Sequence, residues 1–243
     1  MRSLRVAIRR FNLFGKLHVK LQISIVKKYF FVFFLFVGSV AYAQKVVKDA
    51  AFVYDIEVRA KDGKEKIPAG FENAKMNLII SGDKSRKEFI SSLGTETSVY
   101  DGSLHKGFIL KEFSGQKLMI TADHDDWELL NQNNKQIAFS QPQESSKIAG
   151  LEVEKTTGTF ADGKMISVWF APSIILANKT YNGAFPGLKG LPVQFEIESG
   201  NLIFSYKLQS WSENVAATSK FDAPKGGYRV MTFNESRQIK KSN

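Results

Sequence analysis

The chain has 243 residues, no cysteine and a formal net charge of +10 at pH 7. Without cysteine it forms no disulfide bond, uses no thiolate and lacks the residue on which bacterial lipoproteins carry their lipid. Eight of the 34 Lys and Arg residues lie within residues 1–43, which contain no Asp or Glu. Residues 44–243 therefore contain 26 basic and 24 acidic residues. Because that remainder is close to neutral, it lacks the clustered positive charge that nucleic acid requires, and we expect no nucleic-acid partner.

Residues 1–43 have the parts of a secretory signal peptide with a long basic preface. Lys27 and Lys28 form its charged end, residues 29–37 are an almost unbroken apolar run, and Ala41 and Ala43 are small residues at the positions that signal peptidase reads. The apolar run is shorter than the roughly 20 residues that cross a bilayer as a helix. We therefore expect a mature protein that begins at Gln44, is exported to the periplasm or beyond, is soluble and has no transmembrane span.

The stretch before Lys27 leaves other interpretations open. The leader could stay uncleaved as a membrane anchor. Residues 9–13 partly match a twin-arginine export signal, although Asn12 stands where an apolar residue is expected, and an Arg-rich, acid-free start is also typical of mitochondrial transit peptides. A translation start near Ile25 or Val26 explains the preface best, because the chain fits a compact signal from Lys27 onward.

From Gln44 onward, apolar and polar residues alternate with a period of two, which indicates strands with one buried face. The apolar members of these segments are Phe52, Tyr54, Ile56 and Val58; Met76, Leu78 and Ile80; Ile166, Val168 and Phe170; Val193, Phe195 and Ile197; and Leu202, Phe204, Tyr206 and Leu208. Turn sequences separate the strands, namely Gly82-Asp83, Asp101-Gly102, Ser114-Gly115, Asp162-Gly163 and Ser199-Gly200-Asn201. Strands at such short spacing, without crossover helices, predict an antiparallel meander.

Helix is predicted in one place, where Asp123 is a suitable N-cap for a short segment through Leu130. One short helix cannot cover the apolar face of eight to ten strands, so the sheet must curl into a barrel or half-barrel, or split into a sandwich. The meander order favours a single curled sheet. We expect one mainly β domain over residues 44–234 with at most one or two short helices, loops over residues 61–73 and 131–147, and a polar, frayed tail over residues 235–243.

Potential metal ligands gather at residues 123–126, Asp-His-Asp-Asp. Calcium and zinc need ligands that converge on one point, whereas adjacent residues at a helix start point in different directions. We therefore interpret this segment as an acidic helix N-terminus and predict no metal site. His105, beside Lys106, is expected on the surface of a hairpin.

No nucleophile elbow, phosphate-binding loop, dinucleotide fingerprint or His-Glu-x-x-His motif occurs, so we predict no catalytic residues and no cofactor. Acids such as Glu57, Glu196 and Glu198 fall on the polar faces of strands, where solvation is their usual role. A carboxylate pair across a cleft, which would serve glycoside hydrolysis, stays open as an alternative. The tryptophans at positions 127, 169 and 211 are expected in the core or at its rim.

Five segments, in chain order, resemble the GLPGLI group of short exported domains typical of the Bacteroidetes. Residues 185–192, Phe-Pro-Gly-Leu-Lys-Gly-Leu-Pro, resemble its signature, with Lys189 and Pro192 in place of Pro and Ile. The other four are residues 82–86, similar to an early hairpin; 147–155, similar to an "I-x-G-Y-x-C-x-K" strand with Leu151 for Tyr and Val153 for Cys; 168–172, similar to "W-Y-x-P"; and 221–228, similar to "F-x-x-P-x-G-Y". The departures place the chain on a branch near that group.

The resemblance implies a fold similar to that of the outer-membrane lipoprotein carriers, whose curled sheet holds acyl chains, although this chain is short of their covering helices. In the signature, glycines allow backbone conformations closed to other residues, and Pro186 and Pro192 end strand pairing, which predicts a sharp loop. An incompletely filled apolar face would leave a pocket. We expect its mouth at the signature loop, formed by Phe185, Gly187, Leu188, Gly190 and Leu191.

The leading functional hypothesis is a non-enzymatic envelope protein that binds a hydrophobic or lipid-like ligand, or a protein partner. A hydrolase with unrecognised carboxylates and a purely structural envelope component are the alternatives. Acids lining an interior cleft would favour the hydrolase, and a filled interior would favour the structural role.

The leader generates the first testable prediction. The intact mass of the protein recovered from its native host should correspond to loss of residues 1–43, with Gln44 first and open to cyclisation as pyroglutamate. A stable full-length species in the membrane fraction would contradict cleavage.

Overall fold

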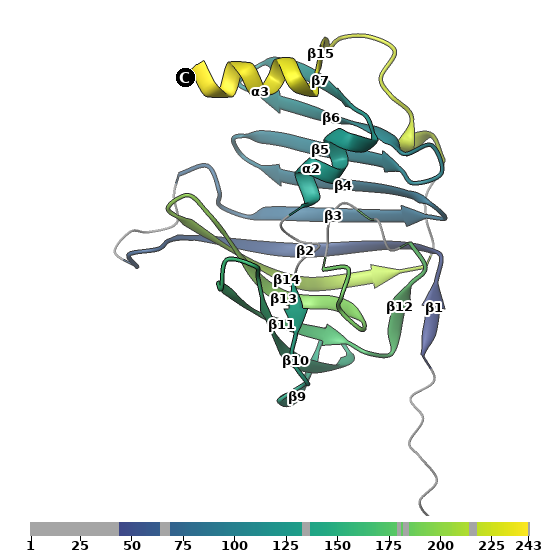
Figure 1. The fold of residues 1–243 in the computed structure, drawn as a ribbon, viewed down its shortest axis with the longest axis vertical. Coiled ribbons are helices and arrows are strands. Elements are labelled where there is room, and N and C mark those ends of the chain that lie inside the picture. Colours follow the sequence, from purple (N-terminus) through teal and green to yellow (C-terminus); the bar gives the residue numbers. More distant parts are fainter. Residues whose placement is uncertain are drawn as a thin grey trace, which may run out of the picture. The chain divides into compact units, whose positions relative to one another are not determined.

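A meander of antiparallel hairpins makes up the first half of the sheet in this computed structural model, which describes residues 44–63, 69–132, 137–178, 181, 185–213 and 218–242 (Figure 1). Ala41 and Ala43 lie outside the described residues, and Gln44 is the first within them. The meander consists of β2 (Asp49–Ala60), β3 (Ala74–Ser81), β4 (Lys84–Ser91), β5 (Gly94–Asp101), β6 (Lys106–Phe113) and β7 (Gln116–Ala122). The expected turns join these strands: Ser81 pairs with Lys84 across Gly82-Asp83, and Phe113 pairs with Gln116 across Ser114-Gly115.

A second antiparallel run completes the same sheet. It consists of β10 (Leu151–Thr159), β11 (Met165–Ala171), β13 (Leu191–Ser199) and β14 (Leu202–Ser212). Its last strand, β14, pairs antiparallel with β2 and so joins the two runs edge to edge.

Short strands extend the edges. The two-residue β8 (Ala138–Phe139) and β9 (Glu144–Ile148) pair with β10, and β15 (Arg229–Thr232) pairs in parallel with β7. A separate two-stranded parallel sheet is formed by β1 (Lys45–Val47) and β12 (Ile174–Leu176). The main sheet therefore has 13 strands among the described residues, more than the eight to ten expected.

Segment 131–147 was expected to be a loop, and this expectation was wrong in its second half. Residues 144–148 form β9, which turns at Ala149-Gly150, both with positive φ, into β10. The segment that resembles a single strand of the GLPGLI group, residues 147–155, thus spans a hairpin. The polar sequence of β9 hides it, because four of its five residues are exposed and carry no apolar alternation.

The single curled sheet is confirmed. The ring centroids of Phe89 in β4 and Phe204 in β14 are 6.1 Å apart, although β3 and β2 lie between these strands. Three interstrand spacings in a flat sheet would separate the two strands by roughly 14 Å. The sheet therefore bends so that side chains from distant strands meet on its inner face. Within the part of the chain that the structure describes, the sheet does not close into a barrel, because its end strands, β15 and the β8–β9 edge of β10, do not pair with each other.

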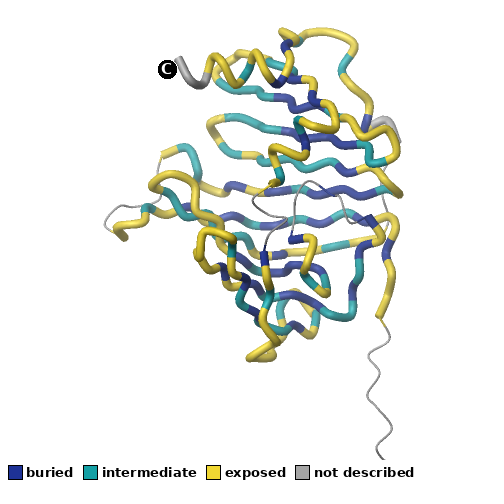
Figure 2. The backbone as a smooth tube through the Cα atoms, in the orientation of Figure 1, coloured by how far each residue is buried: buried dark blue, intermediate teal, exposed yellow. Residues whose placement is uncertain are grey.

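The predicted alternation is confirmed along most of the inner face (Figure 2). Phe52, Tyr54 and Val58 of β2 are at most 1% exposed, and Val168 of β11 is fully buried. Burial fails where β13 and β14 approach their shared turn: Ile197 is 40% exposed, and Leu202, Phe204 and Tyr206 are only half-buried. The apolar face is thus filled at one end of the strands and incompletely covered at the other.

Helix α2 (His124–Asn131) starts as predicted. The Asp123 side chain accepts a hydrogen bond from the Asp126 amide (3.0 Å), and the Asp126 carboxylate accepts one from the Asp123 amide (3.1 Å), which forms a capping box. The helix buries Trp127 against Tyr100 of β5, with ring centroids 5.1 Å apart. Trp127 is therefore a core residue of this end of the sheet.

The polar tail expected over residues 235–243 is helical as far as the structure describes it, because residues up to Ser242 belong to helix α3 (Phe233–Ser242). Its start is fixed by Thr232 and Glu235: the Glu235 carboxylate accepts hydrogen bonds from the Thr232 amide (2.7 Å) and hydroxyl (2.9 Å), and the Glu235 amide donates to that hydroxyl (3.2 Å). The sequence Thr-x-x-Glu at this position is itself a capping-box signal.

The closing "F-x-x-P-x-G-Y" segment packs on the outer face of the sheet. Phe221, in the 3₁₀ helix η3 (Thr218–Phe221), is buried against Val99 and Phe108. The Tyr228 hydroxyl donates a hydrogen bond to the Glu112 carboxylate, which lowers the pKa of Glu112 and raises the pKa of Tyr228 to about 12. The two aromatic residues thus fasten the C-terminal segment across β5 and β6.

The signature loop uses its glycines differently from what we expected. Neither Gly187 nor Gly190 has a positive φ. Instead, a Cβ at Gly190 would lie 2.4 Å from the Ala171 carbonyl oxygen, so the chain passes too close to β11 for a side chain. Pro192 does not end pairing either: it lies within β13, opposite Phe170 at a register shift, where a missing amide is tolerated.

These two glycines allow a matched test of packing. Gly190→Ala should lower the free energy of unfolding by about 1–3 kcal/mol, because the backbone of β11 cannot move away from the new methyl group. Gly187→Ala is the control: its Cβ would lie 3.4 Å from its nearest neighbour, and the change should stay within about 0.5 kcal/mol. Urea denaturation measures both, and equal effects would contradict the close-approach explanation.

Candidate functional site

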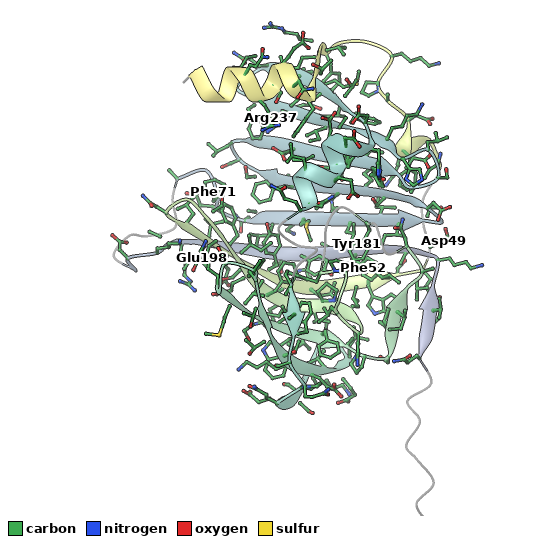
Figure 3. The ribbon with its side chains drawn as sticks, in the orientation of Figure 1. Asp49, Phe52, Phe71, Tyr181, Glu198 and Arg237 are labelled. Atoms are coloured by element: carbon green, nitrogen blue, oxygen red, sulfur yellow. The ribbon has the colours of Figure 1, made fainter. Side chains whose placement is uncertain are left out.

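A cavity of about 1070 Å³ lies on the inner face of the curled sheet. Its walls come from β3, β4 and β5 on one side and from β11, β13 and β14 on the other, with Tyr181 and Phe185 between. Turns and strand ends contribute further lining residues, namely Leu93, Phe160, Ala161, Asp162, Lys164, Met165 and Ser199. Figure 3 places Phe71 and Glu198 at one end of the strands, and Phe52 further along them.

Aromatic rings make up much of the cavity wall. The rings of Phe71, Phe89 and Phe204 meet edge to face with centroids 5.8–6.3 Å apart, and all three are half-buried. Phe195 stacks on Tyr206 with centroids 4.8 Å apart. These contacts hold the rings in place while leaving part of each ring open to the cavity.

The rim of the cavity also carries large apolar side chains. Met165 is 75% exposed, Leu93 48% and Ile197 40%, and all three line the cavity. Large exposed apolar side chains that converge on one opening are typical of an entrance for a hydrophobic ligand.

Charged side chains near the rim are paired with one another. Arg59 contacts Glu196 at 2.9 Å, Lys61 contacts Glu198 at 2.6 Å and Lys164 contacts Asp162 at 2.7 Å. These exposed pairs contribute little stability individually, but they keep the carboxylates at the opening in ionic contacts.

Two carboxylates at the opening, those of Glu196 and Asp162, have lowered pKa values. A hydrogen bond from Ser205, aided by Arg59, lowers the pKa of Glu196, and a hydrogen bond from Lys164 lowers the pKa of Asp162. A carboxyl group that protonates a leaving group needs a raised pKa instead. Glu57, the third acid considered from the sequence, is exposed on β2 and does not line the cavity.

Charged and hydroxyl groups interrupt the apolar lining of the cavity. Lys87 of β4 and Glu96 of β5 both line it, and Glu96 forms an ion pair with Lys111 of β6 at 2.9 Å. Burial raises the pKa of Tyr206 to about 12, and the negative charge of Glu96 adds to this effect. Burial also raises the pKa of Tyr181 and lowers the pKa of Lys87.

Among the five residues expected at a pocket mouth, Phe185 lines the cavity. It is 6% exposed and packs edge to face on Phe195, with centroids 5.1 Å apart. Leu191 is fully buried in β13, and Leu188 is half-buried against the same core. Together with Gly187 and Gly190, these leucines lie outside the cavity lining. Among the lining residues, the large apolar side chains that are exposed belong to Leu93, Met165 and Ile197.

The acidic segment 123–126 lies at the start of α2, away from the cavity lining. Here the structure brings together two histidines that the sequence left separate: the rings of His105 and His124 meet with centroids 5.2 Å apart. Within the described residues, no three His, Asp or Glu side chains form a group that could hold a metal ion.

Sequence reasoning missed Lys87 because β4, Lys-Ser-Arg-Lys-Glu-Phe-Ile-Ser, carries no clear alternation. The signal was nevertheless present. A two-residue turn at Gly82-Asp83 pairs Leu78 with Lys87, and Leu78 belongs to the apolar face of β3. Counting outward from the turn would have placed this lysine on the inner face of the sheet.

No family model matches the chain, and no curated protein sequence matches it. Among solved structures, it is similar to PNGF-II (TM-score 0.44, 12% identity, 79% of this chain and 33% of that chain covered). It is also similar to an uncharacterised conserved protein from Thermus thermophilus (0.40, 12%, 74% and 90%) and to LprF from Mycobacterium bovis (0.36, 14%, 73% and 90%). The chain thus spans a third of PNGF-II, and these distant likenesses carry no argument about function.

The helix start at Asp123 generates a prediction about metals. Chelation with EDTA should leave the thermal midpoint of the protein unchanged, because residues 123–126 are explained by helix capping. Replacing His124 and Asp125 by Ala should lower the free energy of unfolding by about 0.5–2 kcal/mol, the size of a cap or dipole effect. A rise of many degrees in the midpoint on adding calcium or zinc would contradict this interpretation.

Proposed function

We propose that this protein is a binding module for a hydrophobic, lipid-like ligand, which it holds in the cavity on the inner face of the curled sheet. The observation that carries the proposal is the cavity of about 1070 Å³, walled by half-buried aromatic rings and opened by an apolar rim. Sites for small molecules typically have volumes of about 300–1,000 Å³ and mostly apolar walls with few polar groups.

The energetics of burial support such a ligand. Each methylene transferred from water into an apolar site contributes about 0.8 kcal/mol, so an acyl chain of ordinary length gains useful affinity without a polar anchor. The half-buried rings of Phe71, Phe89 and Phe204 also have surface to bury when a ligand enters.

The other functions considered from the sequence have less support. A purely structural component would be expected to fill its interior with its own side chains, whereas this inner face holds a large cavity. A hydrolase would need a carboxyl group suited to proton donation, and the shifted carboxylates at the opening have lowered pKa values. A protein partner that covers the exposed apolar side chains of the rim is the second candidate.

The proposal includes export to the cell envelope, based on the leader, and a relation to the GLPGLI group, based on the five segments. Several of these segments have an identifiable structural role in the fold. Gly82-Asp83 forms a hairpin turn, Gly190 allows close approach to β11, and Tyr228 fastens the C-terminal segment. Within the described residues, neither α-helix is long and apolar enough to span a membrane.

A variant that fills the cavity tests the proposal. Ser91 lines the cavity and is half-buried, so Ser91→Trp should occupy space that a ligand would use. We expect gentle native mass spectrometry of the wild-type protein, purified from its own envelope, to show a co-purifying lipid, and Ser91→Trp to lose most of it.

The control carries the same substitution on the outer face. Ser167 is exposed on β11 between the buried Ile166 and Val168, so Ser167→Trp adds an indole without entering the cavity. It should retain the wild-type amount of lipid. A wild-type protein that is free of lipid and takes up none from vesicles would refute the proposed function.

A further inference from the structure

A lysine interrupts the apolar wall of the cavity. Lys87 lies in the middle of β4, in register with Leu78 of β3 on one side and Ser98 of β5 on the other, both of which are buried. Phe89, two residues along the same face, leads toward the opening, and both side chains line the cavity. A cation is thus held among largely apolar neighbours.

The Lys87 ammonium has no ionic partner among the residues that the structure describes. The acidic residue nearest in register is Glu96, and it already forms an ion pair with Lys111, with a nitrogen–oxygen distance of 2.9 Å. Burial lowers the pKa of Lys87, and the negative charge of Glu96 only partly offsets this effect. A half-buried cation whose charge is only partly compensated is unfavourable, and an incoming anion would relieve that cost.

The position of Lys87 along its strand sets the direction of binding. From Lys87 to Ser91, which lies beside the β4–β5 turn at the opening, the strand advances four residues, or roughly 13 Å. The rings of Phe71, Phe89 and Phe204 line the cavity together with both residues. A negatively charged group at Lys87 would therefore lie deep, with an attached chain passing along these rings toward the apolar rim.

We propose that Lys87 is the anchor for the negatively charged head of a single-chain amphiphile, which enters head first and leaves its hydrocarbon tail along the aromatic wall. The head is a carboxylate or a phosphate monoester, since both accept charge-assisted hydrogen bonds from an ammonium group. This inference rests on the proposed function, because it requires the cavity to hold a ligand.

Isothermal titration calorimetry with three ligands of equal chain length tests the anchor: dodecanoate, dodecyl phosphate and dodecanol. Wild-type protein should bind at least one of the two anions roughly ten- to hundredfold more tightly than the alcohol. The anion that binds more tightly identifies the head group as carboxylate or phosphate. Equal affinity for both shows that Lys87 recognises the negative charge and not the shape of the head group.

Lys87→Met removes the charge while keeping most of the apolar stem, and it should reduce affinity for the anions to that for dodecanol. Lys87→Arg should retain the preference for anions. The matched control is Lys75→Met on β3, because Lys75 is exposed on the other face of the sheet, and its affinities should equal those of the wild type. A thermal midpoint for Lys87→Met close to that of the wild type verifies folding, and Lys87→Gln replaces it if the midpoint falls.

The outcomes separate this inference from the proposed function. If dodecanol binds the wild type as tightly as both anions, or if Lys87→Met and Lys87→Gln bind the anions as the wild type does, the anchor is refuted while the cavity stands as a hydrophobic site. If none of the three ligands binds the wild type, both proposals fall.

Discussion

The pairing of β14 with β2 is the constraint on which the rest of the structure depends. It joins two antiparallel runs that are each continuous along the chain, and it places Tyr206 opposite Ile56 and Phe204 opposite Val58. Because side chains alternate strictly between the faces of a sheet, this register puts the apolar residues of both runs on one surface. The bend that brings Phe89 to Phe204, and the cavity beneath it, follow from that common surface.

The same apolar alternation forms both a core and a cavity. At one end of the inner face, Phe52, Tyr54 and Ile80 are closely packed, and the Tyr54 hydroxyl donates a hydrogen bond to the Pro192 carbonyl (2.8 Å). At the other end, the two walls are held apart by aromatic side chains that touch at their edges. Rigid rings contribute large apolar surface at low conformational cost, so they suit a wall that must stay open.

Much of the fold could be predicted from the sequence, because the local sequence patterns favour the same strands, turns and helix start that the packed structure contains. The alternation around Tyr54 and Val168, the turn at Gly82-Asp83 and the Asp123 cap each express a rule that acts over a few residues. The curl could be predicted as well, since too little helix is present to cover the sheet. Strand β9 escaped prediction because its residues take their conformation from pairing with β10 and not from their own composition.

The site was harder to predict than the fold, for a related reason. The signature leucines were expected at an opening, yet Leu191 is fully buried. The missing side chain of Gly190 lets the backbone of the loop pack directly against β11. The exposed apolar residues of the cavity lining, Leu93, Met165 and Ile197, come from hairpins that are remote in sequence. Which exposed apolar residues converge depends on how far the sheet bends, and no local pattern encodes that. Lys87 is the exception, since register alone would have placed it.

The β2–β14 pairing also has a consequence for how the chain acquires its shape. Val58 and Phe204 pair across nearly 150 residues, so the first run of hairpins can form well before its partner is available. Until β14 docks, the edge of β2 presents unpaired amides and carbonyls beside an uncovered stripe of aromatic and branched side chains, the arrangement most prone to pairing with another chain. We therefore expect the inner face of the sheet to be enclosed in a late folding step, when β14 pairs with β2.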